Sequence, residues 1–223
     1  RAAAAAGGRA PGLGTRRPAA AAAEAREPAA ARAVDTSGRP ARPAGRAADS
    51  WNKWQDDIAA LRKLGANTYR LGIEWSRLEP TKDTWDDAAI AHYKQILADL
   101  KTAGIRPVVT LCHFTLPLWL ATKNKASNAL EWESGGWEDP ATVTQFEQYA
   151  TKVAEEFSAD VDWWITINEI NVFVAFGWAT GDWPPGVRSQ QRMANAFVNL
   201  MKGHAAATRA LRANDTTDAD GDG

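Results

Sequence analysis

The chain has 223 residues, of which 24% are charged, and its formal net charge is −1 at pH 7. A nearly balanced charge gives no electrostatic reason to expect binding to nucleic acid or to a membrane surface. No stretch approaches the roughly 18 consecutive apolar residues of a membrane span, and one cysteine, Cys112, cannot form an internal disulfide.

Residues 1–48 differ in composition from everything that follows. Residues 1–50 contain twenty Ala and nine Arg but no Lys and no aromatic residue, whereas all eleven Trp come later. So few large apolar side chains cannot offset the entropy lost when a segment becomes ordered. We therefore expect residues 1–48 to be a low-complexity segment that is disordered or was translated out of frame.

Residues 49–213 alternate helical and strand patterns. Apolar residues at helical spacing predict four helices, the first ending at Gly65, the second before Gly104, the third starting after Asp139-Pro140 and the fourth over residues 190–213. The residues expected along one face of each helix are, in order, Trp54, Ile58, Leu61 and Leu64; Ile90, Tyr93, Leu97 and Leu100; Phe146, Tyr149, Val153 and Phe157; and Phe197, Leu200, His204 and Leu211.

Three short apolar runs between these helices predict strands, at residues 67–73, 106–112 and 162–169. A long connection containing Gly135-Gly136-Trp137 separates the second run from the third helix. Strands that alternate with helices and are apolar along most of their length are typical of a parallel sheet covered by helices. Since three strands complete neither a doubly wound sheet nor a barrel, we expect an α/β domain that is part of a larger one.

Residues 214–223 form an acidic tail that we expect to be flexible. Asp218, Asp220, Asp222 and Gly223 fit the opening of an EF-hand calcium loop, but no bidentate Glu follows them in this sequence. A solvated acidic loop is the simpler interpretation. We expect no metal site and no cofactor.

Polar side chains accompany the end of each predicted strand. Arg70 and Glu74 belong to the first, His113 to the second, and Asn168 and Glu169 to the third. Each alone has an ordinary structural explanation, but the carboxyl ends of parallel strands meet at one edge, where (β/α) barrels carry their active sites. The third strand also contains Trp163 and Trp164. If such indoles surround the Glu169 carboxyl group, it would stay protonated near neutral pH and could act as an acid.

Four motifs stand in a defined order: residues 67–77 (NTYRLGIEWSR), 110–117 (TLCHFTLP), 135–137 (GGW) and 166–169 (TINE). Their sequence, order and spacing resemble family 1 glycoside hydrolases, the β-glucosidase-like retaining enzymes. The resemblance covers about residues 48–210. It implies that residues 49–213 are a partial (β/α)8 TIM barrel comprising strands two to four with their helices.

The resemblance also implies a role for individual residues. Glu169 matches the general acid/base, and Asn168 matches the contact to the sugar 2-hydroxyl. His113 and Phe114 match substrate-binding positions, and Arg70 matches the arginine that orients the nucleophilic carboxylate. Retaining hydrolysis uses such an acid with a second carboxylate about 5 Å away.

The chain departs from the family pattern at three points. Ile170 replaces the usual Pro after the acid/base, and Phe114 replaces the usual Trp after the histidine. No Glu follows residue 169, so the nucleophile has no candidate in this sequence. We expect an enzyme, by family a hydrolase of O-glycosyl bonds in β-glucosides or related β-glycosides, and we expect this chain alone to be an inactive fragment.

Two alternatives remain open at this point. One is an enzyme of another family that shares the Asn-Glu strand ending, such as a β-glycanase. The other is a non-catalytic carbohydrate-binding or vestigial glycosidase-like protein. In each case the expected partner is a β-linked glycoside, with no nucleic acid and no membrane.

Overall fold

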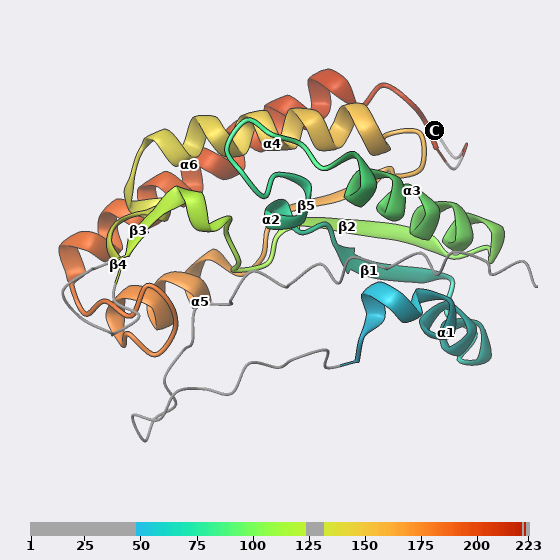
Figure 1. Ribbon diagram of the computed structural model, residues 1–223, viewed down its shortest axis with the longest axis horizontal. Helices are drawn as coiled ribbons and strands as arrows, with labels where there is room; N and C mark the ends of the chain where they lie inside the picture. The colour runs from blue at the N-terminus through green and yellow to red at the C-terminus, as the bar shows by residue number, and fades with distance from the viewer. Residues whose placement is uncertain (1–47, 124–131, 220, 222–223) are drawn as a thin grey trace, which may run out of the picture. The chain divides into compact units, whose positions relative to one another are not determined.

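The computed structural model describes residues 48–123, 132–219 and 221. In this part of the chain, β1 (Thr68–Gly72), β2 (Arg106–Cys112) and β5 (Trp163–Ile167) form a parallel sheet in the order β1-β2-β5 (Figure 1). The register places Gly72 beside Thr110, and Thr110 beside Ile165. All three strands therefore end at the same edge of the sheet.

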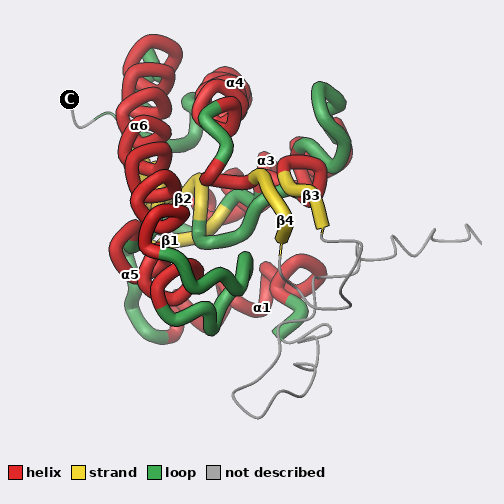
Figure 2. Tube along the Cα trace, turned by 90° about the vertical axis from the view of Figure 1, so that its left-hand side faces the viewer, coloured by secondary structure: helices red, strands yellow, loops and turns green. Residues whose placement is uncertain are grey.

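Long helices precede, connect and follow these strands: α1 (Ser50–Lys63) comes before β1, α3 (Asp87–Thr102) and α4 (Ala141–Phe157) lie between the strands in the chain, and α6 (Gln190–Asn214) comes after β5. Figure 1 shows α3, α4 and α6 on the same face of the sheet and α1 beside β1, and the tube in Figure 2 shows the same arrangement from the side. Local chemistry sets the helix ends. The Asp86 carboxylate accepts a hydrogen bond from Ala89 N, and Gly104 follows α3 with a φ of 70°, which glycine adopts at little cost.

A layer of aromatic side chains lies between the sheet and α4. Trp75, Trp137, Phe146 and Tyr149 are all fully buried there. Trp75 stacks on Tyr149 with 5.0 Å between ring centroids, and Tyr149 Oη donates to Ile73 O at 2.7 Å. This phenol thereby anchors the carboxyl end of β1 to α4.

The structure confirms the three sheet strands, the four long helices and the α/β class. Two details of the prediction are wrong. The third strand ends at Ile167 rather than Glu169, and Leu64, Phe197 and His204 are exposed rather than part of the buried helix faces. The buried face of α6 consists mainly of small residues, because the helix packs closely on α4 and on Trp137: Ala196, Asn199, Leu200, Gly203, Ala206, Ala207, Ala210 and Leu211.

The long connection before α4 contains structure that the sequence patterns did not predict. β3 (Ala121–Lys123) and β4 (Trp132–Gly135) form an antiparallel pair between two 3₁₀ turns, η1 (Leu118–Leu120) and η2 (Gly136–Glu138). Three short helices were also missed: α2 (Trp75–Leu78), α5 (Ile170–Val174) and the π-helix η3 (Ala175–Ala179). Elements of three to five residues are too short for a helical or strand period to emerge.

The predicted terminal segments are only partly described. Residues 1–47, Asp220, Asp222 and Gly223 lie outside the described residues. The first residues of the acidic tail contact the domain, since Trp164 Nε1 donates to Asp215 Oδ2 at 2.6 Å and Ala219 N donates to Asp162 Oδ1 at 2.7 Å.

Neither residues 48–123 nor residues 132–219 hold a group of three or more His, Cys, Asp or Glu that could bind a metal ion. The helices in these ranges are all too short or too polar to cross a membrane.

Candidate functional site

The candidate site lies at the edge where β1, β2 and β5 end. Backbone hydrogen bonds continue past the strands, from Ile73 N to Thr110 O at 3.1 Å and from Asn168 N to Cys112 O at 2.9 Å. These bonds align the residues that follow each strand. The structure therefore places His113 on the strand between those that carry Arg70 and Asn168, as the parallel arrangement predicted.

Arg70 and Asn168 contact each other directly. Arg70 Nη2 donates to Asn168 Oδ1 at 2.6 Å, and Arg70 Nε donates to Thr110 Oγ1 at 2.8 Å. Asn168 and Thr110 are buried, whereas the Arg70 side chain reaches the exposed face of the sheet. Arg70, Thr110 and Asn168 form a row of three side chains that links all three strands. Both bonds are charge-assisted and well oriented, because a guanidinium donates them.

Glu169 directly follows Asn168 and is the N-cap residue of α5. Its φ of 42° lies in the left-handed region, which costs a non-glycine residue roughly 1–3 kcal/mol, and residues strained in this way cluster at functional sites. The carboxylate is exposed, so the expectation that indoles surround it is wrong. Trp163 and Trp164 belong to the opposite end of β5, where Trp163 is 51% exposed and Trp164 contacts Asp215.

His113 and Phe114 follow β2. His113 is exposed, and its ring lies edge-on to Phe114 with 4.9 Å between centroids. Phe114 has a φ of 75° and packs against Phe173 and Trp183, at 5.4 Å and 5.0 Å. Because Phe173 belongs to α5, these rings join the segment after β2 to the segment after β5 and form an aromatic wall next to Glu169.

Glu74 is a second carboxylate at this edge. Thr115 Oγ1 donates to Glu74 Oε2 at 2.8 Å, and Glu74 N donates to Tyr93 Oη at 3.0 Å. Burial raises the pKa of Tyr93 to about 12, so this phenol stays neutral. The contacts of Glu74 connect the ends of β1 and β2.

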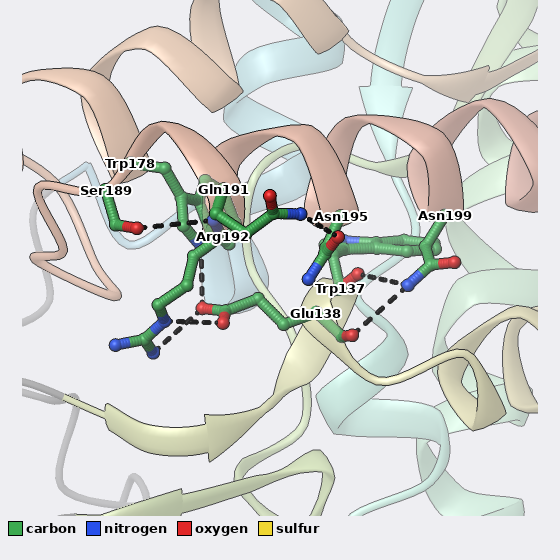
Figure 3. Close-up of polar contacts among 8 residues, drawn as sticks. All are labelled: Trp137, Glu138, Trp178, Ser189, Gln191, Arg192, Asn195 and Asn199. Atoms are coloured by element: carbon green, nitrogen blue, oxygen red, sulfur yellow. Dashed lines mark hydrogen bonds and ion pairs between the residues drawn. The ribbon is translucent and has the colours of Figure 1, made fainter.

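A polar network anchors the segment after β5 to α6 (Figure 3). Arg192 contacts both oxygens of Glu138, with Nε 2.6 Å from Oε2 and Nη2 3.0 Å from Oε1. Trp178 Nε1 donates to Glu138 Oε1 at 2.7 Å, and Asn199 Nδ2 donates to Trp137 O at 3.0 Å. The Gly135-Gly136-Trp137 motif therefore lies in a turn that α6 and the π-helix hold from two sides.

Several residues of this site were not predicted from the sequence. Thr110 was quoted in a motif but given no role, although a single Thr near the end of an apolar strand was an available signal. Trp183 and Phe173 follow Glu169 at no recognisable spacing, and only the fold brings them to Phe114. Among the described residues, no hydrogen bond or ion pair joins Glu169 to His113 or Arg70.

The sequence and the fold were compared with known proteins. The family model "Glycosyl hydrolase family 1" matches residues 35–221, which is most of the chain. The chain belongs to glycosyl hydrolase family 1. The matched region extends beyond residues 48–210, the part of the chain that the resemblance was expected to cover.

Two proteins with similar sequences are named as a beta-galactosidase and a cytosolic beta-glucosidase. The chain is 33% identical over 208 residues to a beta-galactosidase of Pyrococcus woesei, covering 78% of this chain and 41% of that protein. It is 39% identical over 165 residues to the cytosolic beta-glucosidase of Cavia porcellus, covering 72% of this chain and 33% of that one. This family 1 chain thus spans about one third to two fifths of the length of these relatives.

Solved structures agree with this assignment. A beta-glycosidase from Pyrococcus horikoshii superimposes with a TM-score of 0.66 at 37% identity, covering 74% of this chain and 36% of that structure. A family 1 β-glucosidase from Thermotoga maritima, in complex with isofagomine lactam, gives a TM-score of 0.67 at 31% identity over 75% of this chain and 36% of that one.

Proposed function

We propose that the chain forms part of an enzyme that hydrolyses O-glycosyl bonds in β-glucosides or related β-glycosides by a retaining mechanism. In this proposal, β1, β2 and β5 correspond to strands two to four of a (β/α)8 barrel. The observation that supports it best is the arrangement at the strand ends. Arg70, Asn168 and the adjacent Glu169 share one edge of the sheet with His113 and Phe114, within a chain of family 1.

Each residue has a chemical role in the proposed reaction. Glu169 protonates the departing glycosidic oxygen and later removes a proton from water, while Asn168 and His113 hydrogen-bond to the sugar hydroxyls. Phe114 offers a flat apolar surface for a sugar ring. Arg70 carries the positive charge that would orient a nucleophilic carboxylate and keep it ionised.

The reaction needs a second carboxylate about 5–5.5 Å from the acid. In the family pattern this nucleophile follows the acid in the chain, whereas Glu74 precedes it and this sequence has no Glu after residue 169. We therefore propose that the chain alone binds glycosides without hydrolysing them. The same observation favours the alternative function, a non-catalytic carbohydrate-binding protein. The two proposals differ in whether Glu169 serves as an acid when a nucleophile is supplied.

Two measurements on the purified chain test the proposal. The first is titration with deoxynojirimycin, an inhibitor bound in one T. maritima β-glucosidase structure. We expect saturable binding that His113→Ala weakens about tenfold, which corresponds to the loss of one hydrogen bond to a ligand. Absence of binding would contradict a sugar site in this chain.

The second measurement is hydrolysis of 4-nitrophenyl β-glucoside. We expect no turnover above the uncatalysed rate. Turnover that disappears in Glu169→Gln would show that the chain supplies its own second carboxylate and would refute the proposed inactivity. A longer protein that includes this chain and hydrolyses the same glucoside should lose at least 100-fold in kcat on Glu169→Gln, and retention of activity would exclude Glu169 as the acid.

A further inference from the structure

A row of three side chains crosses the sheet at its carboxyl edge. Thr110 on β2 accepts from Arg70 Nε at 2.8 Å, and Asn168 after β5 accepts from Arg70 Nη2 at 2.6 Å. Thr110 is 1% exposed and Asn168 is 7% exposed, so water does not compete freely for either oxygen. Arg70 is held on two of its nitrogens by two strands other than its own.

The chemistry of arginine determines how the Asn168 amide is oriented. A guanidinium has five N–H donors and no acceptor, and it stays charged at every relevant pH. The atom of Asn168 that faces Arg70 must therefore be the carbonyl oxygen Oδ1. The amide nitrogen Nδ2, with its two N–H donors, necessarily points the other way.

Thr110 determines how the guanidinium itself is oriented. Nε and Nη2 lie on one side of the planar group, so a bond at Nε fixes the plane in which Nη2 donates. Val109 and Leu111 beside Thr110 offer no side-chain acceptor for Nε. If the Thr110 hydroxyl were removed, Arg70 Nε would lose its protein partner and the guanidinium plane could rotate away from Asn168.

The free donors of this row are available to a ligand. Among residues 48–123 and 132–219, the one hydrogen bond of the Asn168 side chain is the bond that Oδ1 accepts from Arg70, so Nδ2 keeps its two donors. Glu169, the proposed acid, is the next residue in the chain. A group that binds beside Glu169 must therefore present a hydrogen-bond acceptor to Asn168, and a sugar hydroxyl oxygen supplies one.

We propose that Thr110 is a positioning residue of the glycoside site. Its hydroxyl holds the guanidinium of Arg70, and Arg70 in turn holds the Asn168 amide with Nδ2 directed at a hydroxyl oxygen of the bound sugar. The ligand in this proposal rests on the proposed function, whereas the arrangement of the three side chains does not. Arg70 thus acts on Asn168 in addition to any role toward a nucleophile.

The arrangement is tested by NMR on the full ¹⁵N-labelled chain. The resonances of Arg70 Nε–H and Asn168 Nδ2H₂ are assigned from their absence in Arg70→Lys and Asn168→Asp. In the unmodified chain we expect Arg70 Nε–H to exchange with water at least tenfold more slowly than in free arginine. If Arg70 Nε–H exchanges as fast as in free arginine, the proposal is overturned, and no other variant is needed to decide this.

Substitution of Thr110 separates the hydroxyl from the shape of the side chain. Thr110→Val keeps the shape and removes the acceptor, whereas Thr110→Ser keeps the acceptor and is the matched control. We expect the Val variant to lose the slow exchange of Arg70 Nε–H and to shift the Asn168 Nδ2 resonance, and the Ser variant to retain both. A Val variant that retains both signals, with unchanged far-UV circular dichroism, overturns the role of Thr110.

The ligand is tested by titrating the same samples with deoxynojirimycin. We expect the Asn168 Nδ2 resonance to shift on binding, with a Kd about tenfold higher for Thr110→Val and within twofold of the unmodified chain for Thr110→Ser. Equal affinity of all three proteins overturns the positioning role. An intact row of hydrogen bonds without imino-sugar binding instead refutes the proposed glycoside site and, with it, the ligand assigned to Asn168.

Discussion

Substitution of Gly203 by alanine tests how closely α6 packs on the Gly135-Gly136-Trp137 motif. A Cβ at position 203 would lie 2.7 Å and 2.9 Å from two carbons of the Trp137 indole, whereas carbon atoms in contact prefer about 3.5–4.0 Å. Trp137 is fully buried and packs edge-on against Phe146, with 5.3 Å between centroids, so the ring has little room to move.

Two opposing effects set the expected magnitude. Overpacking of a buried site costs about 1–3 kcal/mol, and the rigid environment of Trp137 favours the upper end of this range. Replacing a helical glycine by alanine contributes about 1 kcal/mol of stability in the opposite direction. We therefore expect Gly203→Ala to lower the free energy of unfolding by about 2 kcal/mol.

Urea denaturation monitored by tryptophan fluorescence measures this change. Ala205→Gly, at an exposed position of the same helix, is the control for helix propensity and should lose about 1 kcal/mol. In a Trp137→Phe background the smaller ring should relieve the overlap, so Gly203→Ala should cost much less there. If Gly203→Ala makes the chain more stable by about 1 kcal/mol, propensity alone governs the site and the packing argument is refuted.

Three further predictions concern polar contacts. Glu138→Gln removes the negative charge that its arginine and tryptophan partners contact, and we expect a loss of about 1–3 kcal/mol in the same urea assay; an unchanged midpoint would show that the network in Figure 3 is not stabilising. Tyr149→Phe leaves the carbonyl of buried Ile73, just after β1, without this donor and should also cost about 1–3 kcal/mol, with unchanged m-value. Hydrogen bonds from Lys152 and Lys94 lower the pKa of Glu156. Its contribution to the free energy of unfolding, below about 1 kcal/mol, is therefore present above the ordinary Glu pKa and lost as pH falls through the lowered value. The loss of stability in Glu156→Gln should thus be largest at pH 7 and shrink as the pH falls below the ordinary Glu pKa, and a loss that does not change with pH would exclude the ion pair as its cause.

Local sequence patterns predicted most of the regular structure. The period of Phe146, Tyr149, Val153 and Phe157 indicated α4, and all four side chains are buried. The same reasoning assigned Phe197 and His204 of α6 to a buried face, which is wrong. Small residues form the buried face of that helix, and the pattern of large apolar residues does not reveal close packing.

The candidate site, too, could be predicted only in part from the sequence. The sequence identified Arg70, His113, Asn168 and Glu169 as neighbours, because residues that end successive parallel strands must share an edge. It did not identify Thr110 as the partner of Arg70. Hydrogen bonds between strands depend on the register and twist of the sheet, which no single segment encodes.

The sequence by itself therefore determined where the strands and long helices lie, that the strands form a parallel sheet, and which residues lie at its carboxyl edge. Only the tertiary structure decided that Arg70 bonds to Asn168, that Glu169 is exposed, and that Trp137 excludes a side chain at position 203. The physical reason is the range of the interactions. Periodicity and helix capping act over a few residues, whereas these contacts join residues 66 to 98 positions apart in the chain.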